Sequence, residues 1–339
     1  MVNIGVIGCG HWGPNHIRVF NQLADSQVQM CADLNQERLN VIKTLYSECE
    51  ITTKYRDIIQ NESIDAVCVS SPTNTHFQFS KEALEHGKHV FCEKPLTLQP
   101  QESLELSRIV KDKEKILMVG HVFLFNSGIV WLKKCIDSGE LGKILYAHSE
   151  RTNLGPFRYD VNALWDLAPH DISIFNYLFE QGPISVSARG HKCLSENNED
   201  LAFASLEYPN NIFVNVHVSW LDPKKVRQIT IVGDKKMVVW DDLDNDGPIK
   251  LYDRHVERTS KFYETYGEFQ LLSRLGSITV PNVGFQEPLK VQGQYFVDCV
   301  KNNTSPDITD AQKGYDVVNA LCAIQKSIDN NGALEYIKS

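Results

Sequence analysis

The fold of this chain is decided at residues 2–13, which read VNIGVIGCGHWG. An apolar run ends here in three glycines with the spacing G-x-G-x-x-G, and a stretch of helical length follows. A strand that enters such a turn and continues as a helix is typical of dinucleotide binding. Gly8 permits the tight turn, Gly10 lets a pyrophosphate approach the backbone, and Gly13 allows the helix to pack closely on the strand. The N–H groups and the partial positive charge at the start of the helix would stabilise the phosphates.

An acidic residue at a suitable distance favours this interpretation over that of a purely structural turn. Asp33 ends the second apolar run, where its carboxylate would accept hydrogen bonds from an adenosine ribose. The same carboxylate would repel a 2′-phosphate, and the next residues, Leu34 and Asn35, provide no cation that could bind one. The sequence therefore predicts NAD rather than NADP as the cofactor. The cofactor contacts expected in this region are Gly8, Gly10, His11, Trp12, Gly13 and Asp33.

The first 120 residues alternate between short apolar runs and amphipathic stretches of helical length. Runs that are apolar on successive positions indicate strands buried on both faces of a parallel sheet. The expected strands are 3–8, 28–33, 65–71, 89–94 and 116–121, and the expected helices are 15–23, 36–46, 75–86 and 101–113. This repetition predicts right-handed crossovers and a doubly wound sheet. We therefore expect residues 1–121 to form an NAD-binding Rossmann domain.

The pattern changes in the second half, and we expect residues 122–339 to form a substrate-binding and oligomerisation domain. Residues 214–220 alternate between apolar and polar, which favours an antiparallel strand with one covered face. The expected strands are 144–151, 184–193, 201–208, 211–220, 228–232 and 237–240, joined as a meander, and the expected helices are 127–138, 164–179, 291–301 and 311–329. The predicted fold class is α/β, a Rossmann domain followed by an α+β domain with a large, mostly antiparallel open sheet. Such a sheet needs a cover, so we expect a homodimer or homotetramer.

Composition excludes several function classes. The chain has 34 Lys and Arg against 43 Asp and Glu, a net charge of −9, and no basic run, so we expect no nucleic-acid partner. No apolar run approaches the ~18 residues of a membrane span, and the first residues do not resemble a signal peptide. The nine cysteines are scattered without a CxxC pair, which favours reduced thiols, a cytoplasmic location and no metal site.

Two further motifs carry candidate chemistry. Glu93-Lys94-Pro95 follows the fifth expected strand, at the sheet edge where ligands of open α/β sheets bind. Asp166 and His170 are four residues apart, so on a helix they share a face. Each motif has a simpler explanation by itself, because a lysine at a strand end is often a solvated charge. In the same way, an Asp near a helix start can be a cap beside a core histidine.

The order and spacing of these motifs, together with SSPTNTH at 70–76, resemble the Gfo/Idh/MocA oxidoreductase family over essentially the whole chain. The resemblance implies that Lys94 is the active-site lysine and that Asp166 and His170 are the catalytic pair. It also implies that a loop lines the cofactor and that an acidic residue stands beside the lysine. The matching residues are Ser71, Thr73 and His76 on the loop and Glu93 beside the lysine, and the resemblance implies that these four and Lys94 contact the cofactor.

The residue types fit the oxidation of a secondary alcohol, in which a base takes the hydroxyl proton while hydride leaves the same carbon. His170 is the expected base, because imidazole titrates near neutral pH. The Lys94 ammonium would bind the reacting oxygen, and Asp166 would orient these groups. His121 and Arg158 are further candidates for substrate contacts. The alternatives are that His121 is hydrogen-bonded within the protein and that Arg158 is a structural arginine.

The resemblance further implies that the substrate is a nucleotide-linked sugar, whose C3 hydroxyl is oxidised to give a 3-keto sugar. Residues 153–166 are similar to the stretch in family members that act on nucleotide-linked sugars, such as UDP-N-acetylglucosamine 3-dehydrogenases. Arg151 and Arg158 would bind the diphosphate, unless they pair with carboxylates such as Glu150 and Asp160. The alternatives are an inositol, polyol or free-sugar dehydrogenase and a non-catalytic NAD-responsive regulator.

Overall fold

The computed structural model describes residues 1–155, 157–158, 160–194, 196–253, 255–256, 273–274 and 276–337. The chain divides into two compact units. The first unit comprises residues 1–125 and 286–322, and the second comprises residues 126–285 and 323–339. This division differs from the two continuous domains 1–121 and 122–339 that we expected, because a segment near the C-terminus packs with the N-terminal residues.

The first unit is built on a six-stranded sheet in the order β3-β2-β1-β4-β5-β6, with every neighbouring pair parallel. Its strands are β1 (Val2–Ile7), β2 (Ser26–Ala32), β3 (Glu50–Thr52), β4 (Ala66–Val69), β5 (His89–Cys92) and β6 (Leu117–Val119). The doubly wound Rossmann fold is confirmed. The short β3 was not predicted, because its three residues give no periodic signal.

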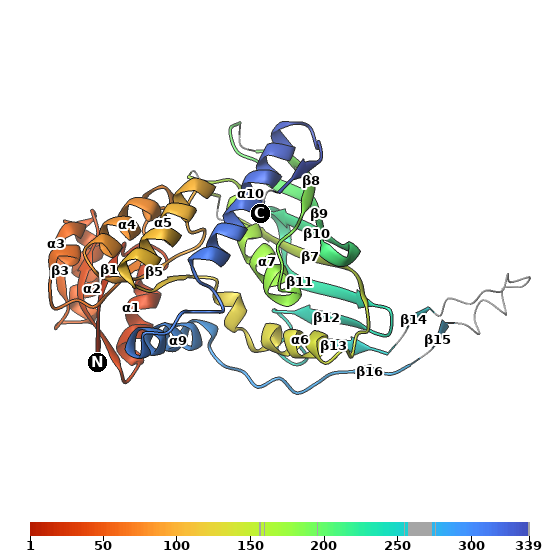
Figure 1. Ribbon diagram of the computed structural model, residues 1–339, viewed down its shortest axis with the longest axis horizontal. Coiled ribbons are helices and arrows are strands. Elements are labelled where there is room, and N and C mark those ends of the chain that lie inside the picture. The colour runs from red at the N-terminus through yellow and green to blue at the C-terminus, as the bar shows by residue number, and fades with distance from the viewer. Residues whose placement is uncertain are drawn as a thin grey trace, which may run out of the picture. The chain divides into compact units, whose positions relative to one another are not determined.

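Helices connect these strands, and one further helix packs with them. They are α1 (Gly13–Gln22), α2 (Gln36–Leu45), α3 (Tyr55–Gln60), α4 (His76–Glu85), α5 (Pro100–Lys113) and, from the C-terminal part of the chain, α9 (Pro288–Asn302). Figure 1 shows α9 beside α1, although more than 250 residues separate them in sequence. A Cβ at Gly293 would lie 2.8 Å from Cγ1 of Val19, so the two helices pack in direct contact. Lys301 also forms an ion pair with Asp25. These contacts are why residues 286–322 belong to the first unit.

The second unit is built on a larger, mixed sheet. Among the described residues its order is β16-β13-β12-β11-β7-β10-β9-β8-β17. The strands are β7 (Ile144–Leu154), β8 (Ser185–His191), β9 (Leu201–Tyr208), β10 (Ile212–Ser219), β11 (Leu221–Gly233), β12 (Met237–Asp241), β13 (Ile249–Tyr252), β16 (Ile278–Thr279) and β17 (Glu335–Tyr336). The mostly antiparallel open sheet is confirmed. The expected simple meander is wrong at one point, because β7 lies between β10 and β11 and pairs parallel with β10.

One face of this sheet is covered and the other is open. Helices α6 (Ser127–Asp137) and α7 (Ala163–Phe179) contact the sheet, and alternate residues of β10, including Val214 and Val216, are buried. The last helix is α10 (Ala311–Asp329). On the opposite face, Tyr146, Phe203 and Phe213 are 44%, 48% and 46% exposed.

Within the described parts of the chain, no helix is long and apolar enough to cross a membrane. In those same parts, no three His, Cys, Asp or Glu side chains are grouped so that they could hold a metal ion. All nine cysteines are free thiols in this structure, and seven of them are buried.

Candidate functional site

The glycine turn between β1 and α1 has the geometry that the motif predicts. Gly8 has φ +99°, and a Cβ there would lie 2.7 Å from backbone atoms of Ser70 and Ser71. A Cβ at Gly13 would lie 2.1 Å from the carbonyl oxygen of Gly8, so only glycine lets α1 approach the strand this closely. A Cβ at Gly10 would have one neighbour within 4 Å, the Arg38 guanidinium at 3.7 Å, so the turn is open on this side.

The two residues between these glycines stand at the start of α1. Trp12 is 36% exposed and meets the His11 ring edge to face, with the centroids 5.6 Å apart. An exposed aromatic side chain thus stands at the start of α1, and the N-terminal end of a helix suits a phosphate-bearing ligand.

Asp33 is held by the backbone beside this turn. Its Oδ2 accepts a hydrogen bond from the Cys9 N–H at 2.7 Å, and its Oδ1 accepts one from the Asn35 N–H at 2.8 Å. Each carboxylate oxygen keeps a lone pair, so Asp33 can still accept hydrogen bonds from ribose hydroxyls.

A cation that sequence reasoning missed lies next to this carboxylate. Nη1 of Arg38 lies 3.6 Å from Oδ2 of Asp33, and the Arg38 side chain is 55% exposed. Arg38 stands in the first turn of α2, which the Asn35 side chain caps by accepting from the Glu37 and Arg38 N–H groups. The sequence signal for this cation is the position of Arg38 in the first helical turn after the Asn35 cap, beyond the two residues that directly follow Asp33.

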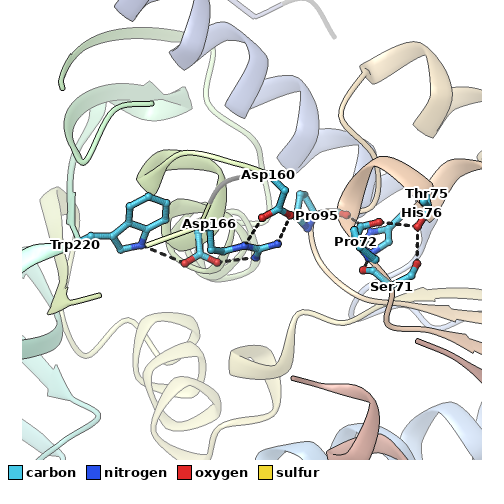
Figure 2. A network of polar contacts seen from close by, with 9 residues as sticks. Ser71, Pro72, Thr75, His76, Pro95, Asp160, Asp166 and Trp220 are labelled. Carbon is cyan, nitrogen blue, oxygen red and sulfur yellow. Dashed lines mark hydrogen bonds and ion pairs between the residues drawn. The ribbon is translucent and has the colours of Figure 1, made fainter. Parts of the chain in front are cut away.

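The loop after β4 is tied to the turn after β5. The ring nitrogens of His76 lie 2.8 Å from the Pro95 carbonyl oxygen and 3.0 Å from the Ser71 carbonyl oxygen, as Figure 2 shows. The hydroxyls of Ser71 and Thr75 are 2.7 Å apart. Thr73 is buried in the short 3₁₀ turn between them. His76 thus has a structural role that fixes the Lys94–Pro95 turn, in addition to any contact with a cofactor.

A buried charged group lies at the end of β5. Glu93 and Lys94 are 7% and 9% exposed, and Oε1 of Glu93 accepts a hydrogen bond from Nε2 of His16 at 2.7 Å. Burial by itself would raise the pKa of Glu93. The hydrogen bond from His16 and the charges of His16 and Lys94 outweigh it and hold that pKa below its ordinary value. Glu93 is therefore a carboxylate at neutral pH.

His121 lies after β6, near Glu93 and Lys94. It is 1% exposed, and neither ring nitrogen has a hydrogen-bond partner among the described residues. Burial lowers the pKa of His121 to about 4, opposed by the charge of Glu93. The imidazole is therefore neutral at pH 7 and keeps one donor and one acceptor for a ligand.

These groups share one edge of the sheet. Because all six strands are parallel, the residues after their C-terminal ends lie on the same edge. Strand order reverses between β1 and β4, which is the position where open α/β sheets bind ligands. The predicted residues that the structure gathers along this edge are Gly8, Gly10, Gly13, Asp33, Ser71, Glu93, Lys94 and His121. The open glycine turn and the oriented carboxylate fit NAD.

The second motif lies on α7 of the second unit, as its spacing predicts. Asn162 caps this helix by accepting from the Trp165 N–H at 3.0 Å. Both oxygens of the Asp166 carboxylate are engaged, Oδ1 by Arg158 at 3.0 Å and Oδ2 by Nε1 of Trp220 at 3.3 Å (Figure 2). His170, one turn later, is 8% exposed, and its backbone carbonyl accepts from the Ser173 hydroxyl. The helix thus presents a carboxylate in a fixed orientation and an imidazole on the same face.

The two arginines proposed for an anionic substrate are both paired with carboxylates. Arg151 is 3% exposed and makes a bidentate pair with Asp171, at 2.8 and 3.0 Å. Arg158 pairs with Asp160 as well as with Asp166. The alternative that we left open for these residues is therefore the one observed, although the Arg151 partner is Asp171 rather than Glu150.

Two family models match the chain. A model described as "Oxidoreductase family, NAD-binding Rossmann fold" matches residues 2–121. A second, described as the "GFO/IDH/MocA C-terminal domain", matches residues 129–239. The first unit is therefore an NAD-binding Rossmann domain, as the glycine turn and Asp33 predicted.

Individual proteins are similar to the chain at lower identity. An inositol 2-dehydrogenase from Saccharopolyspora erythraea is 28% identical over 64% of this chain and 66% of its own length. The chain spans between about half and two thirds of the length of the first curated relatives it matches.

Two solved structures are similar over nearly their full length. The structure of a putative oxidoreductase from Magnetospirillum magnetotacticum has a TM-score of 0.81 at 26% identity, covering 95% of this chain and 99% of that one. The structure of a UDP-N-acetylglucosamine 3-dehydrogenase from Acidithiobacillus ferrooxidans has a TM-score of 0.82 at 22% identity, covering 97% of each chain. The latter likeness concerns the fold alone.

Proposed function

The chain belongs to the Gfo/Idh/MocA oxidoreductase family, and from this premise we propose that it is an NAD-dependent dehydrogenase of a sugar or polyol. The observation that carries the proposal is the position of Lys94. This buried lysine follows β5, on the same sheet edge as the glycine turn and Asp33. A cation there stands where a bound dinucleotide would present its reactive ring.

The chain's own residues supply the proton chemistry, while NAD, when bound, accepts the hydride. We assign His170 as the base that takes the proton from a secondary hydroxyl, and it returns the proton in the reverse direction. Lys94 donates a hydrogen bond to the reacting oxygen and stabilises its developing negative charge. Asp166, held by Arg158 and Trp220, keeps the polar groups of the helix face in place. His121 is a further candidate for a substrate hydroxyl, because both of its nitrogens lack a protein partner among the described residues.

A neutral polyol or free sugar is the substrate class that the charges favour. A diphosphate requires cations that are not already neutralised, and Arg151 is buried in its pair with Asp171. The curated relatives also include several inositol 2-dehydrogenases. A nucleotide-linked sugar such as UDP-N-acetylglucosamine is the second candidate. It is supported by Arg158, whose side chain is still 32% exposed and could exchange Asp160 for a phosphate.

The catalytic assignment is tested with Lys94→Ala and His170→Ala. We expect each variant to lower kcat by about 100-fold or more, because each removes a group that acts in the transition state. NADH affinity, measured by fluorescence titration, should remain close to that of the unaltered protein. Near-normal turnover in both variants would contradict the assignment. Absence of turnover by the unaltered protein on a panel of sugars and polyols would instead favour a non-catalytic NAD-responsive regulator.

The substrate class is tested by comparing myo-inositol, glucose and UDP-N-acetylglucosamine as substrates with NAD. We expect the neutral substrates to be oxidised more efficiently. If UDP-N-acetylglucosamine is preferred, Arg158→Ala should raise KM for it far more than KM for NAD, since the guanidinium would then serve the diphosphate.

We also propose that a second copy of the chain covers the open face of the large sheet, giving a homodimer or homotetramer. The exposed aromatic side chains Tyr146, Phe203 and Phe213 support this proposal. Light scattering should then give a multiple of 38.5 kDa, and Phe203→Glu with Phe213→Glu should shift it to the monomer. The free cysteines suit the cytoplasmic location that we propose.

A further inference from the structure

A buried histidine and a buried glutamate join the cofactor-binding helix to the end of β5. His16 lies in the first turn of α1, three residues after Gly13, and is 1% exposed. Its Nε2 lies 2.7 Å from Oε1 of Glu93, which is 77 residues away in sequence. Because a carboxylate can only accept, His16 is the donor. Neither the glycine motif nor the oxidation chemistry assigned above uses this pair.

Glu93 in turn contacts the residue beside it. Its second oxygen, Oε2, accepts a hydrogen bond from the Lys94 backbone N–H at 3.1 Å. The other side of the carboxylate is packed against Gly120, where a Cβ would lie 3.1 Å from Cδ and Oε1 of Glu93. Three contacts therefore fix the carboxylate. They are the hydrogen bond from His16, the hydrogen bond from the Lys94 backbone and the close packing on Gly120.

Burying the His16–Glu93 pair costs free energy, because both groups lose their hydration. The His16 ring packs against Phe91 and Phe20, with centroid distances of 5.0 and 6.2 Å, in an aromatic cluster. A buried ionised pair is weak evidence for stability, because the loss of hydration offsets most of the attraction. A well-packed apolar pair would serve the fold equally well at this position. A function therefore explains the buried pair better than stability does. The functional residue that Glu93 contacts is Lys94.

From this geometry we infer that His16 is a positioning residue for Lys94, acting through the Glu93 carboxylate. The inference rests on the proposed function, in which Lys94 binds the reacting oxygen. His16 fixes Glu93, Glu93 accepts a hydrogen bond from the Lys94 backbone, and the opposite charges of the Glu93 and Lys94 side chains attract each other. The other titratable groups that face Glu93 are His121 after β6, Cys68 on β4 and Cys92 on β5. Among the described residues, His16 donates a side-chain hydrogen bond to Glu93.

The expected consequence of losing His16 has a definite direction. Without its donor, the buried carboxyl group of Glu93 is more readily protonated, because burial penalises the charged form. A protonated Glu93 no longer favours the ammonium form of Lys94. Lys94 should then lose its proton at lower pH, and the reacting oxygen should be held less firmly.

The main experiment compares His16→Leu, His16→Gln and Glu93→Gln. In His16→Leu and Glu93→Gln we expect kcat to fall by about 10- to 100-fold, with the alkaline limb of its pH profile at lower pH and NADH affinity nearly unchanged. His16→Gln keeps a side-chain N–H for Glu93 and should retain most of the activity. The double variant His16→Leu/Glu93→Gln should lose no more than Glu93→Gln alone, because the two residues act in one chain.

A second measurement does not depend on turnover. The rate at which acetic anhydride labels the Lys94 amine, followed by peptide mass spectrometry across a pH range, reports the neutral amine directly. Labelling should begin at lower pH in His16→Leu and in Glu93→Gln than in the unaltered protein. His89→Leu is the matched control, because His89 lies at the opposite end of the same strand and accepts a hydrogen bond from the Ile116 N–H at 3.1 Å. It should leave both the labelling and kcat unchanged.

The outcomes separate the two proposals. Unchanged labelling and kcat in His16→Leu would overturn the inference, as would an NADH affinity that falls as much as kcat, since His16 would then serve α1 alone. Should His16→Leu not fold, Glu93→Gln carries the same test. An active Lys94→Ala would contradict the proposed function instead, whatever the labelling of Lys94 shows.

Discussion

Carboxylates in the two units are held by different means. In the first unit, Asp33 is held by two backbone N–H groups and Glu93 by a histidine and a backbone N–H. In the second unit, Asp166 and Asp171 are held by guanidinium groups of Arg158 and Arg151. Backbone donors orient a carboxylate and leave its charge for a ligand. Arginine partners cancel much of that charge locally, and an arginine so paired has to give up a carboxylate before it can bind an anion.

The largest expected effect concerns the buried ion pair between Arg151 and Asp171 in the second unit. Arg151→Met should lower the free energy of unfolding by about 3–5 kcal/mol, because it leaves the Asp171 charge buried and unpaired. Urea unfolding of the whole chain measures this loss. Arg151→Met/Asp171→Leu should recover most of it, and Arg56→Met, which removes the exposed partner of Glu82, should change little. A small effect of Arg151→Met would mean that this pair is not buried.

The second prediction tests His121 of the first unit, whose ring nitrogens have no hydrogen-bond partner among the described residues. The pKa of His121 is lowered to about 4 from an ordinary value of 6.5. The unfolded chain therefore binds the proton first. The stability that the neutral imidazole supports is present above pH 6.5 and is lost as the pH falls toward 4. The free energy of unfolding of the unaltered protein should fall by about 2–3 kcal/mol more than that of His121→Leu between pH 7.5 and pH 4. Parallel pH curves would show that His121 is solvated.

The third prediction concerns Asp33 of the first unit and the choice between NAD and NADP. The unaltered protein should use NAD over NADP by at least about tenfold in kcat/KM, or ~1.4 kcal/mol, because Asp33 repels a 2′-phosphate. Asp33→Ser should reduce the ratio of kcat/KM for NAD to kcat/KM for NADP, since Arg38 would then face the 2′-phosphate without its carboxylate partner. Asp33→Ser/Arg38→Ala should lose most of this gain. Equal use of both cofactors by the unaltered protein would show that Asp33 does not meet the ribose.

The smallest effect concerns the neutral donor in the second unit. Trp220→Phe removes the hydrogen bond to Oδ2 of Asp166 while Arg158 still holds Oδ1. One such bond contributes about 1 kcal/mol, so kcat should fall only about fivefold, with NADH affinity unchanged. A fall as large as that of His170→Ala would mean that Trp220, rather than Arg158, sets the orientation of Asp166.

Sequence reasoning was reliable where structure is local. The glycine turn follows from backbone conformations that only glycine adopts, and the pair on α7 follows from helical spacing. Sequence reasoning failed where a strand is very short and where segments distant in sequence pair in a sheet. The three residues of β3 show no period, and nothing in the spacing of β7 predicts that it inserts between β10 and β11. Strand order in a sheet depends on which edges meet, which period and composition do not encode.

The sequence by itself determined the parallel sheet, the NAD-binding turn with Asp33 and the residue types available for proton transfer. Only the tertiary structure decided which partner each charged side chain takes. It joined His16 to Glu93, Arg151 to Asp171 and Trp220 to Asp166, residues 77, 20 and 54 positions apart. The physical reason is that turns and helices are set by neighbouring dihedral angles. A hydrogen bond between distant side chains instead exists only where packing brings the two atoms within about 3 Å.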